Sequence, residues 1–502
     1  MATPAVVTPV AFPAMVGGVL FAPAVTALDL SDTEKNVMSF LAGRLSDSQP
    51  DLMLSYSYYE GMNIVPSLGI AVPPELEALR AVLGWCGAAI DARSERLTLQ
   101  GFRLPGKTTV DEDLQTAWQT NNLDAESVLV HNDAMIYRAS FAVLGVNDID
   151  PSGPPLTTIE SPLNMTAAWD ARRREVSAAY QTYIDCDPTS ETFTKQLATL
   201  YTRTATVQLV LGDKGWMVQE RNDHRMGFVP VIMFANRPTP SNRYGTSEIA
   251  PSWRNTQDRA ARGLVRNEVA AEFFASLKVW LLGVDKQTFQ KADGTMATAL
   301  ETFLGRISML EADKNGVLPQ VVFQQGQDPT GMIKFIDHER QVMAANSAVP
   351  LDYLGLVSDG NPSSADAITK GDFRLAKRSE RLGNQFGNGW EDWGRMTLTM
   401  WGKPTEGAVR LESDWGKFGI PTPNADTVRV TSQVGAGMVS PDSDDALTEV
   451  GWSPVQRARI SATRDEYQAE MEAQAAKVAS QAMDGEQPKA QQGLQAQRDS
   501  RA

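Results

Sequence analysis

The sequence has few of the residues that build metal sites or disulfide frameworks. It contains two cysteines, Cys86 and Cys186, and three histidines, His131, His224 and His338, which lie far apart without the spacing of zinc ligands. Two cysteines in 502 residues give no disulfide framework, which fits a reducing compartment. We therefore expect no metal site and no bound cofactor.

Long apolar runs are also missing. No stretch of about 18 or more apolar residues occurs, so we expect no membrane-spanning helix and no membrane partner. The apolar segment 1–28 contains several prolines and no basic residue, whereas a signal peptide begins with positive charge. We interpret this segment as a flexible or packed N-terminal arm.

Positive charge is in deficit. The chain has 46 Lys and Arg against 61 Asp and Glu, a formal net charge of −15 and a pI near 4.9. Tight, sequence-independent wrapping of DNA requires that phosphates be neutralised by Lys and Arg, and this balance argues against it. An acidic protein can still handle DNA if the DNA has to slide past it, because repulsion prevents sticking.

The first half of the chain has the pattern of an α+β body. Ser31 and Glu34 form the capping box of a first helix, and alternating runs between 156 and 234 indicate an antiparallel sheet. The pattern changes at Gly245, where one long amphipathic helix is predicted from 246 to 282. We therefore predict an α+β, multidomain fold in which roughly the first 240 residues form one α+β body.

A small excursion separates this long helix from a second, shorter one. Asn315-Gly316 is a strong hairpin-turn signal and lies between two alternating runs, 307–310 and 317–323. The chain then returns as a helix over about 332–348, which Pro350 stops. At about 1.5 Å for each residue, the predicted long helix 246–282 is a rod of about 50 Å. A rod of this length needs a packing partner, and another copy of the chain is the natural one.

The stretch from Pro350 to Trp401 combines a polar loop with a long helix. Ser363 and Asp366 form the predicted cap of this helix, and Gly383, Gly387 and Gly389 predict a kink in it. We expect its tryptophans to be part of the core. Its first half carries five basic residues: Lys370, Arg374, Lys377, Arg378 and Arg381.

One motif suggests an enzyme. Gly101 to Thr108 matches the P-loop pattern G-x-x-x-x-G-K-[ST], in which Lys107 would reach phosphate oxygens and Thr108 would hold Mg²⁺. Pro105 removes a backbone donor from that loop, however, and the chain offers no convincing strand that ends in a Walker-B aspartate. We interpret the match as accidental and predict no catalytic residue.

The order of these parts, and several local motifs, resemble the portal (head–tail connector) proteins of tailed double-stranded DNA bacteriophages of the siphophage type. The motif that carries most of the resemblance is Asn361-Pro-Ser-Ser-Ala-Asp-Ala-Ile368. The other motifs are Phe228-Val-Pro-Val-Ile232, Gly245-Thr-Ser-Glu-Ile249, Gln257-Asp258, Pro350-Leu-Asp-Tyr-Leu-Gly355, the stretch from Trp85 through Glu95-Arg-Leu97, and Gly101-Phe102.

This resemblance implies a subunit of a ring that is usually dodecameric and that stands at one capsid vertex. The loop residues Leu356, Val357, Ser358, Asp359, Gly360, Asn361, Pro362 and Ser363 would face DNA in the channel. The implied segments are 1–28 arm, 29–245 wing, 246–284 stem helix, 285–331 clip, 332–349 second stem helix, 350–363 tunnel loop, 364–402 kinked helix, 403–425 wing strand, 426–481 helical crown and 482–502 disordered tail.

The resemblance also implies partners and a location. Family members pass double-stranded DNA without sequence specificity and dock the terminase large subunit and then a head–tail adaptor, beside the major capsid and scaffold proteins. They belong to the virion, after assembly in the host cytoplasm, and are not enzymes. Two alternatives stay open: a P-loop NTPase that uses Gly101 to Thr108, and another virion structural subunit. The basic residues after the loop could touch DNA or pair with acidic residues of the next subunit.

Overall fold

A computed structural model of the chain describes part of the sequence. The described residues are 29–63, 65, 81–107, 110–274, 278–282, 320–324, 330–355, 365–419, 423–441, 443–452, 456–457, 459–460, 463–464 and 471. The chain divides into two units, Met1–Gly419 and Ile420–Ala502, and each is described by itself. Among the described residues, no helix combines the length and the apolar character that a membrane crossing requires.

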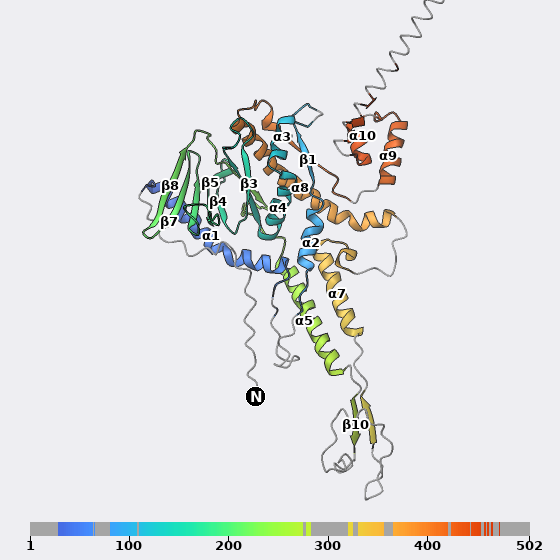
Figure 1. Cartoon of the computed structure of the whole chain (residues 1–502). Helices are drawn as coiled ribbons and strands as arrows, with labels where there is room; N and C mark the ends of the chain where they lie inside the picture. Colours follow the sequence, from blue (N-terminus) through green and yellow to red (C-terminus); the bar gives the residue numbers. More distant parts are fainter. Residues whose placement is uncertain are drawn as a thin grey trace, which may run out of the picture. The chain divides into compact units, whose positions relative to one another are not determined.

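The first unit contains the predicted α+β body, built on two antiparallel sheets (Figure 1). One sheet has five strands in the order β4-β5-β6-β7-β8, and the other has three in the order β3-β2-β9. The strands are β2 (Ala139–Gly145), β3 (Leu156–Glu160), β4 (Met165–Asp170), β5 (Glu175–Ile184), β6 (Gln196–Tyr201), β7 (Ala205–Gly212), β8 (Gly215–Asp223) and β9 (Val231–Ala235). The alternating runs in the sequence thus predicted strands correctly, but not their division between two sheets.

Helix α1 (Asp32–Tyr59) packs against the five-stranded sheet. The predicted capping box is confirmed: the Ser31 hydroxyl accepts from the Glu34 backbone N–H, and the Ser31 N–H donates to the Glu34 carboxylate at 2.9 Å. Leu41 and Leu45 on the helix are buried among apolar side chains that alternate along the strands. Burial of this stripe is what holds α1 to the sheet, because transfer of apolar area from water is the dominant favourable term.

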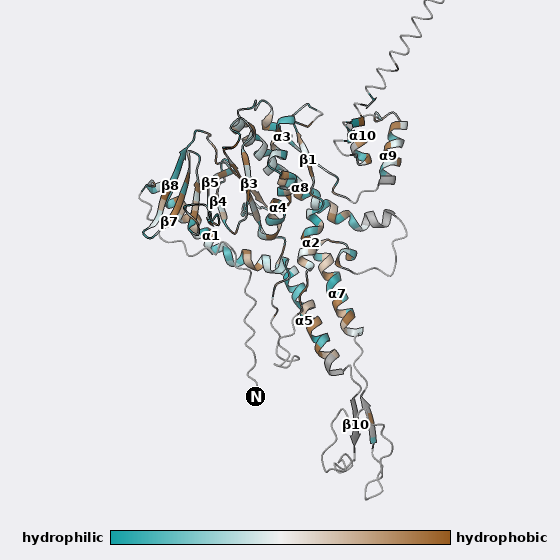
Figure 2. Ribbon diagram, in the orientation of Figure 1, coloured by the Kyte–Doolittle hydropathy of each residue, from teal (hydrophilic) through white to brown (hydrophobic). Residues whose placement is uncertain are grey.

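The main core forms around helix α8 (Ala365–Trp401). Trp390 and Trp393 are fully buried, and Trp390 packs on Phe234 with ring centroids 4.6 Å apart. Figure 2 shows apolar residues on α8 and on strands of the sheets beside it. The helices around it are α2 (Trp85–Ser94), α3 (Glu112–Thr120) and α4 (Leu123–Tyr137). The predicted core position is confirmed for these two tryptophans, whereas Trp401 is half-buried and donates its indole N–H to the Ser152 carbonyl at 2.8 Å.

The glycines of α8 lie where other elements approach the helix most closely. The chain is helical without interruption from Ala365 to Trp401, through Gly383, Gly387 and Gly389. A Cβ atom at Gly383 would lie 2.5 Å from the Phe418 ring, and one at Gly389 would lie 2.6 Å from the Phe234 ring. The glycines therefore have a packing role, and the kink at these positions stays a prediction.

This packing predicts a difference between two glycines of one helix. We expect Gly389→Ala to lower the free energy of unfolding by about 1–3 kcal/mol, because its Cβ would overlap the buried Phe234 ring. Gly371→Ala is the matched control: no atom lies within 4 Å of its Cβ position, so alanine should stabilise the helix by about 0.5–1 kcal/mol. Urea unfolding followed by tryptophan fluorescence measures both. Equal effects would contradict the packing role.

The prediction of one helix over 246–282 is wrong at both ends. Helix α5 begins at Pro251 and ends at Phe274, and residues 278–282 form strand β10 (Lys278–Leu282). Proline has no N–H and is preorganised for the first helical position, so it starts this helix rather than interrupting it. The residues of β10, Val279-Trp-Leu-Leu282, include β-branched and aromatic side chains that favour strands.

Strand β10 pairs antiparallel with β11 (Gln320–Gln324), which overlaps the second of the two predicted alternating runs, 317–323. The first run, 307–310, lies outside the described residues. The predicted turn at Asn315 and Gly316 lies outside the described residues. Helix α7 (Thr330–Ser347) returns beside α5, as Figure 1 shows. The two helices are joined by an ion pair of 2.8 Å between Arg259 and Glu339.

The remaining elements complete the two units. Strand β1 (Leu99–Arg103) pairs with β12 (Glu412–Trp415), which brings the predicted wing strand of 403–425 back to the N-terminal half. The two short helices η3 (Leu351–Leu354) and η4 (Ala408–Arg410) also belong to the first unit. In the second unit, α9 (Pro423–Gly435) and α10 (Asp444–Val450) are linked by an ion pair of 3.1 Å between Arg429 and Glu449.

Candidate functional site

Most of the residues predicted to form the site lie outside the described part of the chain. This holds for the whole predicted loop segment from Leu356 to Ser363, and for Asn315 and Gly316. The described residues on either side of the loop are Leu351–Gly355 upstream and α8, from Ala365, downstream. The candidate site is therefore the set of contacts that fixes these two flanks, which we call the loop base.

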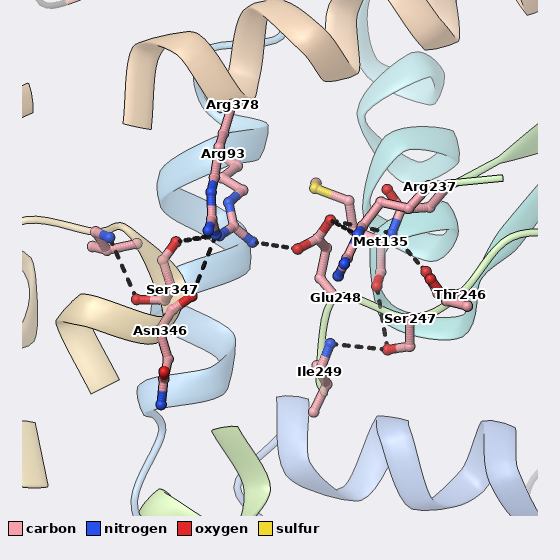
Figure 3. A network of polar contacts seen from close by, with 12 residues as sticks. Arg93, Met135, Arg237, Thr246, Ser247, Glu248, Ile249, Asn346, Ser347 and Arg378 are labelled. Atoms are coloured by element: carbon pink, nitrogen blue, oxygen red, sulfur yellow. Dashed lines mark hydrogen bonds and ion pairs between the residues drawn. The ribbon is translucent and has the colours of Figure 1, made fainter. Parts of the chain in front are cut away.

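Arg93, near the end of α2, is at the centre of the loop base. Its guanidinium is fully buried and lies 3.0 Å from a carboxylate oxygen of Glu248, and it also donates to the Ser347 carbonyl (Figure 3). Burial lowers the pKa of Arg93 to about 10, although Glu248 opposes the shift. Arg93 thus stays charged at neutral pH, and its charge is compensated by the buried carboxylate.

Arg378 of α8 donates to the same carbonyl as Arg93. It donates to the Ser347 oxygen at 2.9 Å and to the Asn346 oxygen at 3.4 Å, so that its side chain lies next to that of Arg93 in Figure 3. These carbonyls end α7, where backbone oxygens have no partner within the helix and the helix dipole favours cations. The end of α7 is therefore held by one arginine from α2 and one from α8.

Glu248 connects this cluster to the start of α5. Its backbone N–H donates to the Met135 carbonyl of α4 at 2.9 Å, and Arg237 lies 3.8 Å from its second carboxylate oxygen. The neighbouring Ser247 hydroxyl accepts from the Ile249 N–H at 3.0 Å. Glu248 thereby fixes the segment that leads into α5 against the body of the unit, as well as pairing with Arg93.

Arg96 ties together the two flanks of the loop. Its guanidinium binds both carboxylate oxygens of Asp372 on α8, at 2.6 and 2.7 Å, and donates to the Tyr353 hydroxyl at 3.0 Å. It also donates to the Phe418 carbonyl at 3.1 Å. Burial opposes the charge on Arg96, but the hydrogen bonds to Asp372 and Tyr353 outweigh it and raise its pKa. One side chain therefore fixes residues upstream and downstream of the loop.

The P-loop match does not have P-loop geometry. A P-loop begins after a strand, whereas Gly101 and Phe102 lie inside β1 and pair with Asp414 and Ser413 of β12. The next helix starts only after Asp111, whose side chain accepts from the Leu114 N–H. The backbone of 101–103 is thus committed to a sheet. Among the residues that the structure describes, no group of three or more His, Cys, Asp or Glu side chains could hold a metal ion.

What the loop base can do is mechanical. Its charged groups are paired with each other or with backbone carbonyls, and none is placed as a nucleophile with an adjacent base. The arrangement fixes four segments relative to one another: the end of α2, the start of α5, the end of α7 and the first half of α8. Such a base fixes the described residues on both sides of the predicted loop.

Known proteins match this chain over most of its length. A model of the family "Phage portal protein, SPP1 Gp6-like" matches residues 42–443. The portal protein of Mycobacterium phage L5 is 31% identical over 421 residues, covering 82% of this chain and 85% of that protein. The portal protein of Mycobacterium phage D29 is 29% identical over 428 residues, covering 84% and 86%.

Solved structures show more distant likenesses. A chain from the virion of a native gene transfer agent particle is 12% identical, with 74% of this chain and 90% of that chain covered and a TM-score of 0.42. A chain from the neck of an empty gene transfer agent particle is 12% identical, with 74% and 91% covered and a TM-score of 0.45. The family model, however, spans residues 42–443, and the chain therefore belongs to the SPP1 Gp6-like family of phage portal proteins.

Proposed function

We propose that this portal protein assembles into a dodecameric ring at one capsid vertex and forms the channel through which DNA is packaged and ejected. The observation that carries the proposal is the family match over residues 42–443. Portal proteins form oligomeric rings in the neck of the phage particle and are structural components of it. The chemistry of the loop base agrees with such a role, because it supports a loop and holds no catalytic set.

The arrangement of the described elements suggests how the chain serves the channel. Helices α5 and α7 form a pair that leads to the paired strands β10 and β11, as expected for a stem and a clip. The loop 356–363 follows α7 and η3 and precedes α8, so a rigid base lies at its root. We assign this loop to the channel wall, where it would contact passing DNA without reading its sequence. The net charge of −15 favours sliding over tight binding.

The partners of the ring follow from this assignment. We propose that the segment 285–331 docks the terminase large subunit during packaging and a head–tail adaptor afterwards, and that the outer body contacts the major capsid and scaffold proteins. Assembly would take place in the host cytoplasm. We also propose that the chain has no enzymatic activity. In particular, the strand pairing of Gly101 and Phe102 disfavours an NTPase built on Gly101 to Thr108.

The ring can be tested on the purified full-length chain. Mass photometry should show a large species of about twelve subunits, and negative-stain images should show rings seen down one axis. Only monomers at micromolar concentration would overturn the proposal, and particles with a capsid-like symmetry would favour another virion subunit. We expect the purified protein to show no ATP turnover, and Lys107→Ala to change nothing. ATP turnover that Lys107→Ala abolishes would instead support the P-loop NTPase.

The role of the loop gives a separate prediction. Deleting Leu356 to Asn361 should leave ring assembly intact while it strongly reduces the amount of DNA that particles package or retain, because the channel loses its contact with DNA. The measurement is the yield of nuclease-resistant genomes from a phage that carries the deletion. Removing the same number of residues from the tail, 490–495, is the control and should have no effect. Normal genome yields from the loop deletion would contradict the role.

A further inference from the structure

The first half of α8 exposes a basic face that the fold of a single chain does not use. Phe373, Arg374, Lys377 and Arg381 make up this face, and all four are exposed. At about 100° for each helical residue they lie within an arc of about 100°. Phe373 is 60% exposed at one edge of this arc, beside three basic side chains, and a phenylalanine is seldom so exposed. An exposed aromatic side chain next to arginines is typical of an interaction surface.

The opposite face of the same helix is fixed to the body. Asp372, Leu375 and Leu382 are buried, and Asp372 is the residue that Arg96 binds. The orientation of α8 is therefore set by its buried side, and the basic face must point away from the body. In the part of the chain that the structure describes, Arg374 and Arg381 form no ion pair, whereas Lys377 pairs only with Glu380 of its own helix.

Two acidic side chains beside the loop base are exposed and do not belong to the basic face. Glu95 precedes Arg96 at the end of α2, and Asp352 precedes Tyr353 in η3; both are exposed. Within the described ranges neither carboxylate is in an ion pair. Arg96 and Tyr353 contact Asp372, directly or through each other, on the buried side of α8, and Glu95 and Asp352 are next in sequence to these two residues. We call these two residues the acidic edge.

A subunit with a basic face and a separate acidic edge is suited to head-to-tail association. Such heterologous contacts join different surfaces of neighbouring copies and generate rings when the rotation closes. Complementary charges favour the correct encounter and fix its register, while an aromatic anchor supplies apolar contact. A neighbouring copy therefore supplies what the basic face lacks.

We propose that the basic face of α8 docks on the acidic edge of the next copy of this chain, so that the bases of successive loops are joined around the ring. The proposal rests on the ring of the proposed function. The interface would place Phe373 of one subunit against its neighbour, with Arg374 and Arg381 facing Glu95 and Asp352 of that neighbour. Each loop base would then be held from both sides, by its own α2 and by the adjacent subunit.

Charge reversal tests the pairing. We expect Arg374→Glu with Arg381→Glu to reduce the fraction of protein in rings at least tenfold at a fixed concentration, and Glu95→Lys with Asp352→Lys to do the same. The variant that carries all four changes should recover rings, because both surfaces are reversed together. Mass photometry measures the ring fraction, and circular dichroism checks that each variant is folded.

A cross-link provides the second measurement. Cys186 is exposed and is first replaced by serine, while Cys86 is buried and its burial raises the pKa of its thiol to about 12, so it stays unreactive. In this background Phe373→Cys with Asp352→Cys should give a ladder of multimers on a non-reducing gel. Either cysteine alone should give no ladder beyond the dimer.

The outcomes separate this proposal from the ring itself. If the wild-type chain forms no rings, the proposed function fails. If rings form and both double charge reversals assemble like the wild type, this interface is wrong although the ring stands. Rings of the Arg374→Glu and Arg381→Glu variant that assemble normally but fail to retain DNA would show that the basic face contacts DNA instead.

Discussion

Replacing Arg93 by methionine is expected to lower the free energy of unfolding by about 3–5 kcal/mol, because the change leaves the buried carboxylate of Glu248 without its main partner. The Glu248 side chain is only 7% exposed, and its other cation, Arg237, is half exposed and 3.8 Å away. The Ser347 carbonyl keeps Arg378 as a donor, so the loss comes mainly from the unpaired charge. Urea unfolding followed by tryptophan fluorescence measures it.

Two controls separate the ion pair from the loss of a large side chain. The double variant Arg93→Met, Glu248→Met removes both charges, and we expect it to recover most of the lost stability, since apolar replacements of a buried pair are often neutral or better. Arg173→Met removes an exposed arginine that lies 3.8 Å from Glu175. It should lower the free energy of unfolding by less than about 1 kcal/mol. An Arg93→Met protein within about 1 kcal/mol of the wild type would contradict the role of the pair.

Local signals in the sequence predicted much of the body. The capping box of Ser31 and Glu34 and the alternation along the strands depend on short-range geometry, and the structure confirms both. The pairing of β1 with β12 joins residues more than 300 positions apart. The local pattern of each segment can predict a strand, but it does not identify the strand with which it pairs.

The end of the long helix shows where periodicity misleads. Residues 275–282 continue the apolar spacing of α5, yet Lys278 to Leu282 form a strand. Short apolar runs satisfy the helical and the extended period equally well, and the partner strand, β11, decides between them. Intrinsic preference was the better indicator here, since Val279 and Trp280 favour strands.

The loop base was not predicted, although two of its residues lie in motifs that carry the family resemblance. Glu248 belongs to Gly245–Ile249, and Arg96 belongs to Glu95-Arg-Leu97. Arginine and glutamate are rarely buried unless paired, so their burial could be predicted only if their partners were known. The pairs that bury them, Arg93 with Glu248 and Arg96 with Asp372, span 155 and 276 positions. Spatial proximity over such distances cannot be inferred from one sequence.

The acid stability of the first unit should depend on His131. This histidine is fully buried beneath α8, where its Nε2 accepts the indole N–H of Trp390 at 3.0 Å and its ring stacks on Phe386. Burial lowers the pKa of His131 from its ordinary value of 6.5 to about 3. Between these values the unfolded chain binds a proton that the folded chain does not. The contribution of the neutral His131 imidazole to the free energy of unfolding is therefore present above about pH 6.5 and is lost as the pH falls towards about 3.

Asp133, two residues away on the same helix, acts in the opposite direction. Burial raises the pKa of its carboxyl from 3.8 to about 6, although a hydrogen bond with Ser161 opposes the shift. The folded chain therefore holds a proton between these values that the unfolded chain has released, and stability rises as the pH falls through about 6. In the wild-type protein the two groups offset each other, so the effect of His131 has to be isolated by substitution.

Between its unfolded and folded pKa values, the titration of His131 lowers the free energy of unfolding by about 1.4 kcal/mol for each pH unit. From pH 7 to about pH 4.5 this loss amounts to about 2–3 kcal/mol, and we expect His131→Gln to remove it. Glutamine can still accept from Trp390 through its side-chain carbonyl, so the variant keeps the hydrogen bond while it removes the titration. Asp133→Asn should do the reverse and make the loss visible in a protein that retains His131. Urea unfolding of all three proteins at the two pH values gives the comparison. If His131→Gln and the wild type lose stability in parallel, the buried imidazole does not set the acid stability of the core.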